Sequence, residues 1–281
     1  MMSFKDYLIE LKKHTPYDFS EYSDNSIYRR IHKIQNDHKL TLDQLSELTR
    51  TNPVFVEHLV EEITVNTTEL FRDPEIWQNL YETVYPALRK NKSINIWHAG
   101  CSSGQEVYSN LILLNELGLL DRCRVMATDI NQKVLNCARQ GKYSLSFNRN
   151  YIDNFNQVLN KDSHKVDFSK YFELDESNDF MRVKSFLLEK PQFIRHNLVS
   201  DEPAFAYKID LLFCRNVLIY FNSTLQAKVV QSFLEQMHNG GFLLLGNHEA
   251  LPGYFKAKFG KNGVAYSKAN SFHLYSGGPC L

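Results

Sequence analysis

Apolar side chains in the first part of the chain recur at the three- to four-residue spacing of amphipathic helices. This spacing covers residues 4–11 and 42–48, and it predicts short helices that each bury one face. Gln44 follows Thr41 by three residues, which is the capping-box pattern found at helix N-termini. We therefore expect residues 1–70 to form an N-terminal helical domain.

Two further helix starts combine a capping residue with a proline. Asn52 precedes Pro53, and Asp73 precedes Pro74. Proline is favoured at the first helical position because the N–H group there has no partner within the helix. The second of these helices should end at Pro86, whose ring clashes with the preceding turn.

From residue 94 onward, short apolar runs alternate with helical stretches. The predicted strands cover residues 94–98, 124–128, 209–214 and 242–245, and the predicted helices cover residues 106–117, 131–139 and 224–237. This alternation indicates βαβ units. It predicts a doubly wound α/β domain with a parallel sheet, which occupies residues 71–281.

One stretch inside this domain breaks the alternation. Polar and aromatic side chains alternate in residues 162–196. This pattern predicts a small antiparallel β insert, with a turn at residues 175–179. Beyond the insert, Gly240 and Gly241 are expected to end the last helix. Residues 265–275 are expected to form a closing hairpin.

The composition narrows the classes of protein. The 32 Lys and Arg residues balance the 32 Asp and Glu residues, so no overall charge attracts nucleic acid or anionic lipid. No apolar run approaches the ~20 residues that span a membrane, and residues 1–13 lack the apolar core of a secretory signal. We expect a cytoplasmic monomer that neither binds nucleic acid nor inserts into a membrane.

Cysteine and histidine give no sign of a metal site. The ten histidines show no metal-ligand spacing. His98, His196 and His248 lie beside predicted strand ends, where a hydrogen-bonded structural role is expected for each. The cysteines are odd in number, form no C-x-x-C pair and are expected to be reduced. They are Cys101, Cys123, Cys137, Cys214 and Cys280.

A short loop after the first predicted strand suggests a cofactor site. Gly100 and Gly104 enclose small residues where backbone can approach a ligand, and a helix N-terminus there offers free N–H groups. Asp129 ends the next strand, where a carboxylate can accept both hydroxyls of a ribose. The loop lacks the middle glycine of a pyrophosphate-binding motif, so a nucleoside without phosphates is favoured, and S-adenosylmethionine fits. The alternative is that the glycines only shape a turn and Asp129 only caps the next helix.

Four motifs occur in order along more than half of the chain. They are NTTELFRD at residues 66–73, AGCSSGQE at 99–106, ATDI at 127–130 and FCRNVLIYF at 213–221. Together with the N-terminal helices and the small insert, they resemble the CheR family of chemotaxis receptor glutamate methyltransferases. The resemblance implies a Rossmann-like class I methyltransferase sheet and transfer of a methyl group from S-adenosylmethionine to receptor glutamate side chains.

The resemblance also implies roles for individual residues. Arg72 and Tyr220 match residues that face the reacting carboxylate, so they are the expected catalytic residues. The chain departs from the family pattern at Leu70, Gln105 and Val107, and none of these departures removes a matched polar contact. The positions that match cofactor contacts are Asn66, Thr68, Arg72, Glu106, Asp129, Asn197, Leu198, Arg215 and Asn216.

The implied reaction agrees with the chemistry of these motifs. A glutamate carboxylate is already ionised at neutral pH, so methyl transfer needs orientation and exclusion of water rather than a general base. Accordingly, the sequence shows no convincing Ser/His/Asp set. Arg72 is suited to hold a carboxylate through its planar fork, and Tyr220 to donate one further hydrogen bond. The alternative for residues 213–221 is a core strand and turn, with Arg215 as a buried salt-bridge partner.

Two surfaces are expected to meet a partner. Arg29 and Lys33 share one helical face within the basic stretch at residues 28–33. With Arg30, this stretch resembles the basic helix through which the family contacts the acidic methylation region of receptor helices, and a solvated charged face is the alternative. The β insert is expected to bind the receptor by adding a strand to its edge.

Other functions compete with receptor methylation. A noncatalytic scaffold that binds S-adenosylmethionine is one, although it would not need Arg72, Asp129, Asn216 and Tyr220 together. A methyltransferase for another protein or a small molecule is the second. A nitrogen methyltransferase would be expected to carry an Asn/Asp-Pro-Pro-Tyr/Phe signature where this chain has RNVLIY at residues 215–220.

Overall fold

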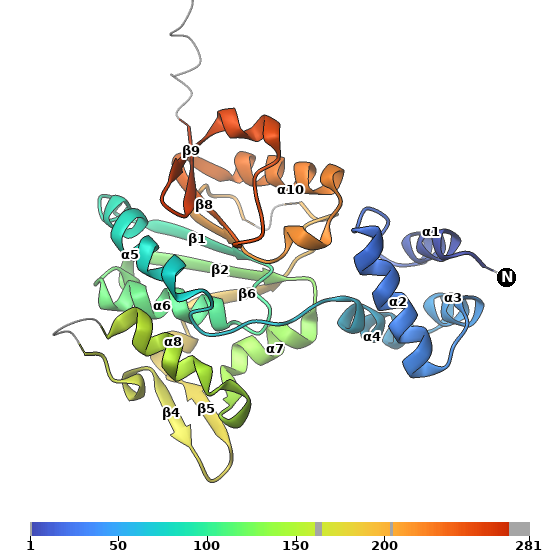
Figure 1. Cartoon of the computed structure of the whole chain (residues 1–281), viewed down its shortest axis with the longest axis horizontal. Coiled ribbons are helices and arrows are strands. Elements are labelled where there is room, and N and C mark those ends of the chain that lie inside the picture. The colour runs from blue at the N-terminus through green and yellow to red at the C-terminus, as the bar shows by residue number, and fades with distance from the viewer. Residues whose placement is uncertain (1, 161–164, 203–204, 270–281) are drawn as a thin grey trace, which may run out of the picture.

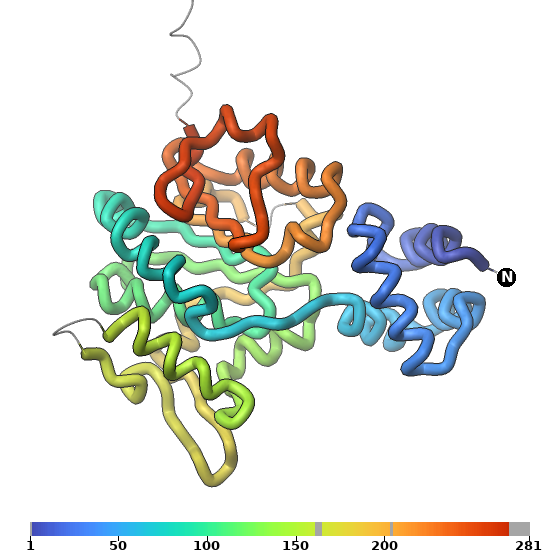
Figure 2. Tube along the Cα trace, in the orientation of Figure 1, coloured from blue at the N-terminus to red at the C-terminus, as the bar shows by residue number. Residues whose placement is uncertain are grey.

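A computed structural model describes residues 2–160, 165–202 and 205–269. Figure 1 shows two parts, which are a group of N-terminal helices (α1–α4) in blue and a larger α/β part built around a central sheet. Figure 2 shows an extended stretch of chain, residues 64–73, that leads from one part to the other. This stretch contains the first of the four motifs.

The N-terminal part consists of α1 (Phe4–His14), α2 (Asp24–His38), α3 (Leu42–Thr51) and α4 (Pro53–Ile63). The apolar faces of these helices meet in one buried cluster that includes Tyr7, Ile31 and Leu45. The predicted capping box is confirmed, because the Gln44 N–H donates to the Thr41 hydroxyl (3.3 Å) and the Thr41 N–H donates to the Gln44 side chain (2.8 Å). The helical pattern read from the sequence is therefore present.

Both helices with a proline start begin where predicted, but only α4 has a side-chain capping hydrogen bond. Asn52 caps α4 by accepting a hydrogen bond from the Phe55 N–H at 3.0 Å. Asp73 is the N-cap residue of α5 (Pro74–Leu88), but its side chain makes no capping hydrogen bond. The backbone of Asp73 is left-handed, with φ 57°, and its carboxylate binds Arg215 at 2.6 Å. The Asp73 carboxylate therefore pairs with the buried Arg215 guanidinium instead of accepting from the N–H groups at the start of α5.

The central sheet has seven strands in the order β6-β2-β1-β7-β8-β10-β9. The strands are β1 (Ile94–Ala99), β2 (Cys123–Asp129), β6 (Pro191–Arg195), β7 (Ile209–Cys214), β8 (Met237–Leu245), β9 (Phe259–Asn262) and β10 (Ala265–Lys268). The first five strands in spatial order pair in parallel, and β10 is antiparallel to both of its neighbours. The predicted parallel sheet is confirmed.

Helices cover both faces of this sheet. Successive residues of a strand point to opposite faces, so Ile96 and Trp97 of β1 enter different hydrophobic clusters. The Ile96 cluster contains the apolar residues of α5 and α6 (Gln105–Glu116), and the Trp97 cluster contains those of α10 (Ser223–Gln236). α7 (Gln132–Gln140) connects β2 to the smaller sheet described next.

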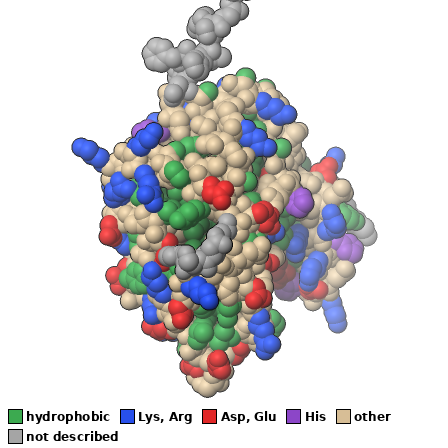
Figure 3. Space-filling model, turned by 60° about the vertical axis from the view of Figure 1, so that its left-hand side comes forward, with side chains coloured by type: hydrophobic (Ala, Val, Ile, Leu, Met, Phe, Trp, Pro, Cys, Tyr) green, Lys and Arg blue, Asp and Glu red, His purple; other side chains and the backbone are tan. Residues whose placement is uncertain are grey.

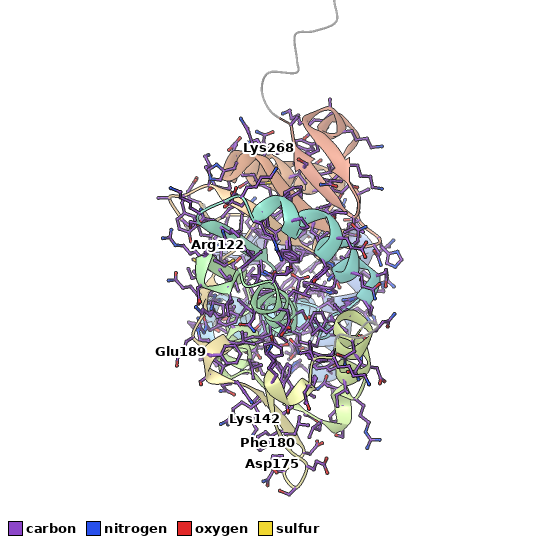
Figure 4. The ribbon with its side chains drawn as sticks, turned by 90° about the vertical axis from the view of Figure 1, so that its left-hand side faces the viewer. Arg122, Lys142, Asp175, Phe180, Glu189 and Lys268 are labelled. Atoms are coloured by element: carbon purple, nitrogen blue, oxygen red, sulfur yellow. The ribbon has the colours of Figure 1, made fainter. Side chains whose placement is uncertain are left out.

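A second, three-stranded antiparallel sheet has the order β3-β5-β4, with β3 (Lys142–Ser144), β4 (Phe172–Asp175) and β5 (Phe180–Val183). The predicted insert and its turn are confirmed, although residues 162–164 of the expected range lie outside the described residues. In Figure 4, Lys142, Phe180 and Asp175 mark this sheet at the end of the molecule opposite Lys268. α8 (Asn150–Leu159) follows β3, and its buried face joins the main core.

Two boundaries of the insert differ from the prediction. β3 precedes the expected range, so the third strand comes from residues for which no element was predicted. Phe193, which was placed within the insert, belongs to β6 and pairs in register with Ala127 of β2 in the main sheet. A polar and aromatic alternation does not distinguish the edge strand of a parallel sheet from an antiparallel strand.

Two helix ends were predicted wrongly. α5 continues two residues past Pro86, because a proline in the last turn removes only one N–H bond and Leu88 is buried in the core. Gly240 and Gly241 do not end α10. They lie inside β8, which starts at Met237, and a Cβ on Gly241 would come within 2.9 Å of the Ile209 carbonyl oxygen. Gly241 thus permits the close approach of β7 and β8 at an irregular register, whereas Gly240 has open space around it and a left-handed backbone with φ 77°.

The last hairpin is formed by β9 and β10, earlier than the expected residues 265–275. The expected residues beyond 269, and Cys280, lie outside the described residues. The other four cysteines are free. Among the described helices, none combines the length and apolarity needed to cross a bilayer. On the face in Figure 3, basic and acidic side chains are interspersed, in agreement with their equal numbers.

Candidate active site

A cavity that is open to solvent lies where the carboxyl ends of the core strands meet the N-terminal helices. β1 has β2 on one side and β7 on the other. In open α/β sheets, ligands bind outside the carboxyl ends of the strands at the point where the strand order reverses. The cavity occupies this position, and α2 and residues 63–69 complete its wall.

All ten residues singled out in the sequence line this one cavity. They come from the extended stretch after α4, the first turn of α6, the end of β2, the loop after β6 and the loop after β7. The ten are Asn66, Thr68, Arg72, Glu106, Asp129, Asn197, Leu198, Arg215, Asn216 and Tyr220. Parallel strands present their carboxyl ends at the same edge, so distant parts of the chain converge there.

The glycine loop forms the floor of the cavity. The N–H groups of Gly100 and Cys101 both donate to the Thr128 carbonyl oxygen, at 2.8 and 2.9 Å, which folds the loop back over the end of β2. Gly100 has φ 77°, and a Cβ there would lie 2.4 Å from a methyl group of Val217. Glycine is therefore required at this position for both conformation and space.

Asp129 is held in place by two backbone amides. Its carboxylate accepts from the Ser102 N–H and from the Asn131 N–H, each at 2.9 Å. Burial raises the pKa of Asp129, and these hydrogen bonds oppose the rise. Asn131, not Asp129, caps α7 through the N–H groups of Lys133 and Val134. Each carboxylate oxygen can accept a second hydrogen bond, so Asp129 retains acceptor capacity toward the cavity.

Arg215 is the centre of a buried ionic network. Its side chain is only 2% exposed, and it contacts Asp73 at 2.6 Å and Glu106 at 3.3 Å. The alternative expectation for Arg215, a buried ion-pair partner, is confirmed. Arg215 also lines the cavity, and its contact with a cofactor stays a prediction. Its Nε is buried without a hydrogen-bond partner among the described residues. One N–H of the guanidinium is thus available to an acceptor from outside the network.

The network continues through Glu106 to His98. His98 Nδ1 lies 3.0 Å from Glu106 Oε1, and the Asn110 amide lies 3.0 Å from His98 Nε2. These contacts fit a neutral ring that donates to Glu106 and accepts from Asn110. His98 is fully buried and stacks on Phe213 at 4.3 Å. It is a structural histidine, as predicted.

The other two histidines differ from His98. His196 lines the cavity, its Nε2 lies 3.3 Å from the Glu202 carbonyl oxygen, and burial lowers its pKa. Its Nδ1 is buried and lacks a partner within the described part of the chain. His248 is exposed beyond the end of β8. The hydrogen-bonded role expected for His248 has no counterpart among the contacts of the described residues.

Arg72 and Tyr220 both line the cavity. Both are partly buried, and Arg72 donates to the Thr67 carbonyl oxygen at 3.3 Å. Burial raises the pKa of Tyr220, and the positive charges of Arg30 and Arg72 oppose the rise. Two guanidinium groups therefore act electrostatically on one phenol.

Arg30 was not predicted to reach the cavity. It was expected only as part of a partner-binding face with Arg29 and Lys33. In the structure Arg30 lines the cavity, whereas Arg29 donates to its own helix at the Asn25 carbonyl oxygen. Lys33 pairs with Asp37. The available signal was the spacing of Arg30 from the buried apolar positions of α2, which places it beside them on the helix.

Two more residues of the site carried no sequence signal. Tyr22 lines the cavity and lies edge-on to Phe221 at 5.0 Å between ring centres. Glu249 accepts hydrogen bonds from the loop that contains Asn216. Each lies far along the chain from the motif that it contacts, so neither spacing nor composition identifies it.

Two family models match this chain, one over the α/β part and one over the helical part. Residues 66–266 match the family model described as "CheR methyltransferase, SAM binding domain". Residues 2–64 match the model described as "CheR methyltransferase, all-alpha domain". The two matches adjoin at the extended stretch that connects the helical part to the α/β part.

Several curated proteins are similar over most of the chain. Identity is 39% over 236 residues with the putative methyltransferase Cher3 of Pseudomonas putida, covering 84% of each protein. It is 34% over 227 residues with chemotaxis protein methyltransferase 1 of Vibrio cholerae, covering 76% of this chain and 78% of that protein. It is 30% over 217 residues with the chemotaxis protein methyltransferase of Borreliella burgdorferi, covering 72% and 71%.

Proposed function

The chain belongs to the CheR methyltransferase family, and from this premise we propose that it methylates glutamate side-chain carboxylates of a chemotaxis receptor. Such methyl esters would tune receptor signalling during adaptation. The observation that carries the proposal is that Arg72, Tyr220 and Arg30 all line the cavity and that both guanidinium groups act electrostatically on the Tyr220 phenol. An anionic acceptor is the kind of substrate that two guanidinium groups and a phenol favour.

S-adenosylmethionine is the cofactor, and the cavity suits its separate chemical parts. Asp129 is assigned to the ribose hydroxyls, because its carboxylate keeps free acceptor capacity at the end of β2. Arg215 offers a buried Nε–H to a carboxylate group. Asp73 and Glu106 place two negative charges around this one guanidinium, which favours a cationic ligand nearby.

The remaining cofactor assignments rest on family matches that fall on the cavity wall. Asn66 and Thr68 belong to the extended stretch after α4, and Asn197 and Leu198 to the loop after β6. Asn216 follows Arg215 in the loop after β7. The full proposed cofactor set is Asn66, Thr68, Arg72, Glu106, Asp129, Asn197, Leu198, Arg215 and Asn216.

For the proposed reaction, the protein must orient the reacting groups and does not need to transfer a proton. When bound, S-adenosylmethionine supplies a methyl group on a positively charged sulfur, which an ionised carboxylate oxygen can take directly. Arg72 would hold the carboxylate through its fork. Tyr220 remains protonated at neutral pH, since its pKa is raised by burial, and it can therefore donate a hydrogen bond. Holding the reacting groups in line is worth up to about 7–11 kcal/mol in favourable cases.

The helical domain and the insert are proposed to bind the receptor. The exposed Arg29 and Lys33 face of α2 carries basic groups on the same helix as Arg30, which suits the acidic methylation region of a receptor helix. In the smaller sheet, β4 pairs only with β5 among the described strands, and its Leu174 is 44% exposed. An edge strand with an exposed apolar side chain is suited to strand addition.

Substitution of Leu174 by Asp tests the docking surface. The added charge at the edge of β4 should weaken binding of a receptor fragment by about 10-fold, without change in cofactor affinity. Binding is measured by calorimetry with the receptor cytoplasmic fragment. The control is Phe147→Ser, which removes an apolar side chain that is 88% exposed and lies outside the sheet. Unchanged receptor affinity in Leu174→Asp would refute docking at this edge.

Two other functions are distinguished by the products. A noncatalytic scaffold would bind the cofactor and the receptor without forming an ester. A methyltransferase for nitrogen would attach a methyl group that resists alkali. The residues RNVLIY at positions 215–220 lack the proline pair expected for nitrogen chemistry, and this favours the carboxylate.

Arg72→Ala provides the test of the catalytic proposal. The protein is incubated with labelled cofactor and membranes that carry a cognate receptor, and the label released by alkali is measured. The wild-type protein should give alkali-labile label, and Arg72→Ala should lose at least about 100-fold in rate because the acceptor is no longer oriented. Arg50→Ala, which changes an exposed arginine paired with Glu47 on α3, should keep the wild-type rate. Alkali-resistant label would exclude the carboxylate, and tight cofactor binding without any label would favour the scaffold.

A further inference from the structure

The loop after β7 depends on a side chain from a different part of the chain. This loop carries Arg215, Asn216 and Tyr220, and three of its backbone N–H groups converge on one carboxylate. The N–H of Asn216 donates to Oε2 of Glu249 at 2.7 Å. The N–H groups of Val217 and Ile219 donate to Oε1, at 2.8 and 3.2 Å.

We propose that Glu249 is a positioning residue, whose carboxylate fixes the Asn216–Tyr220 loop in the conformation that the cofactor and acceptor require. A group of convergent backbone N–H groups forms an anion-binding concavity. In this protein the anion is supplied by the chain itself. The N–H of Gly246 donates to the same carboxylate at 2.7 Å, so the oxygens of Glu249 join the end of β8 to the loop after β7.

The charge and the two equivalent oxygens of Glu249 are both needed for this arrangement. Both oxygens accept from N–H groups, so four donors are satisfied by one side chain. A glutamine would place an NH₂ group against some of these donors. It would therefore leave N–H groups unpaired, although its size is nearly the same.

Asn216 has a backbone conformation that needs stabilising contacts. Asn216 has φ 60°, which is a sparsely populated backbone region for a residue other than glycine. Such a conformation persists when surrounding contacts fix it. The hydrogen bond from its N–H to Glu249 is one of these contacts, and Asn216 itself lines the cavity.

Gly246 offers a second way to disturb the same contact. A Cβ on Gly246 would lie 2.8 Å from Oε2 of Glu249 and 3.0 Å from both the backbone nitrogen and the side-chain nitrogen of Asn216. The backbone of Gly246 has no positive φ, so an alanine at this position would cause no backbone strain. It would disturb the structure only through this steric clash. Gly246→Ala and Glu249→Gln should thus produce the same defect by different means.

The test compares binding of S-adenosylhomocysteine, measured by calorimetry, with the methyl-transfer rate. Glu249→Gln and Gly246→Ala should weaken binding by about 10-fold and lower the rate by about 100-fold, as expected when a residue that orients ligand contacts is lost. The binding measurement does not depend on the identity of the methyl acceptor. If wild-type protein forms no ester, the proposed function fails, and binding still decides the role of Glu249.

Two controls separate positioning from loss of stability. Asp210→Asn changes another buried carboxylate, which accepts from the Asn95 N–H at 2.8 Å at the opposite end of β7. It should lower the melting temperature without weakening binding. In Glu249→Ala, added sodium formate should restore part of the lost affinity, and sodium chloride at the same concentration should not.

The inference is overturned if folded Glu249→Gln binds and methylates as the wild type does. It is also overturned if Asp210→Asn, at an equal loss of melting temperature, shows equal losses of affinity and rate. Absence of any recovery with formate, with Glu249→Ala folded, would likewise contradict a role for the carboxylate as the anion of the loop.

Discussion

Glu106 connects the cavity to the core of the protein. Its carboxylate contacts His98 at 3.0 Å and Arg215 at 3.3 Å. Burial alone would raise the pKa of Glu106, but the His98 hydrogen bond and the Arg215 charge outweigh burial, and the pKa is lowered. Glu106 is therefore ionised in the folded protein at neutral pH. Its charge stabilises a guanidinium that is almost completely buried.

The substitution Glu106→Gln should destabilise the protein in a pH-dependent manner. Loss of one partner of a buried ion pair costs about 3 kcal/mol. A carboxylate whose pKa is lower in the folded state contributes stability above its unfolded pKa, and this contribution disappears as the pH falls through the folded pKa. The difference in unfolding free energy between wild type and Glu106→Gln should thus be largest at neutral pH and shrink below about pH 4.

Urea unfolding between pH 3 and pH 8 measures this difference. Glu47→Gln is the matched control, because Glu47 forms an exposed pair with Arg50 and should contribute less than about 1 kcal/mol at any pH. A difference for Glu106→Gln that stays constant or grows on acidification would contradict the lowered pKa.

At the level of residues, the sequence predicted the cavity wall where a motif was continuous. Asp129 could be identified because a carboxylate at the end of this strand is typical of ribose binding. Arg30 and Glu249 could not be identified. Arg30 required knowledge of how α2 is rotated about its axis, and Glu249 required knowledge that its side chain pairs with a loop 30–33 residues earlier in the chain. Both requirements are set by tertiary packing and not by local spacing.

The segment before α2 is a second support for the loop after β7. The Ser23 N–H donates to the Tyr220 carbonyl oxygen at 2.8 Å, and the Asn222 N–H donates to the Glu21 carbonyl oxygen at 3.0 Å. Between them, Tyr22 and Phe221 form an isolated antiparallel bridge. The helical domain therefore contributes backbone contacts to the segment that carries Tyr220.

Tyr22→Ala should loosen this contact between the two parts. The Tyr22 ring lies edge-on to the rings of Phe19 and Phe221, at 4.9 and 5.0 Å. Loss of both contacts should cost about 2 kcal/mol and speed hydrogen exchange of peptides that cover residues 216–222. Tyr28→Ala, which removes a ring that is 53% exposed on α2, should leave exchange in these peptides unchanged. Equal exchange in the wild type and Tyr22→Ala would show that the bridge does not hold the loop.

At the level of elements, the sequence predicted most of the fold and missed mainly its ends. Periodicity identified the parallel strands and the N-terminal helices, because burial determines both patterns. It missed the continuation of α5 past Pro86, where buried packing outweighs one lost hydrogen bond. It also misread Gly241, which serves a close strand approach rather than a helix end. Local propensity is a weaker influence than tertiary contact at such positions.

The cavity exists only because the two parts of the whole molecule are joined. Beyond the bridge at Tyr22, Arg195 at the end of β6 contacts Glu57 of α4 at 2.7 Å, and Lys133 of α7 contacts Glu61 at 3.1 Å. The Asn131 side chain also donates to Thr64 at 2.9 Å. The helical part thus closes one side of the cofactor cavity, and it places Arg30 near Tyr220. We expect the acceptor carboxylate to bind at this junction.

The most direct test of the central claim is to locate the transferred methyl group. A receptor cytoplasmic fragment is incubated with the protein and S-adenosylmethionine, digested, and mapped by mass spectrometry, with Arg72→Ala and Arg50→Ala in parallel. We predict an added methyl group on glutamate side chains, which is removed by alkali, present with Arg50→Ala and absent with Arg72→Ala. A methyl group on a nitrogen, or an unmodified fragment despite bound cofactor, would contradict the assignment.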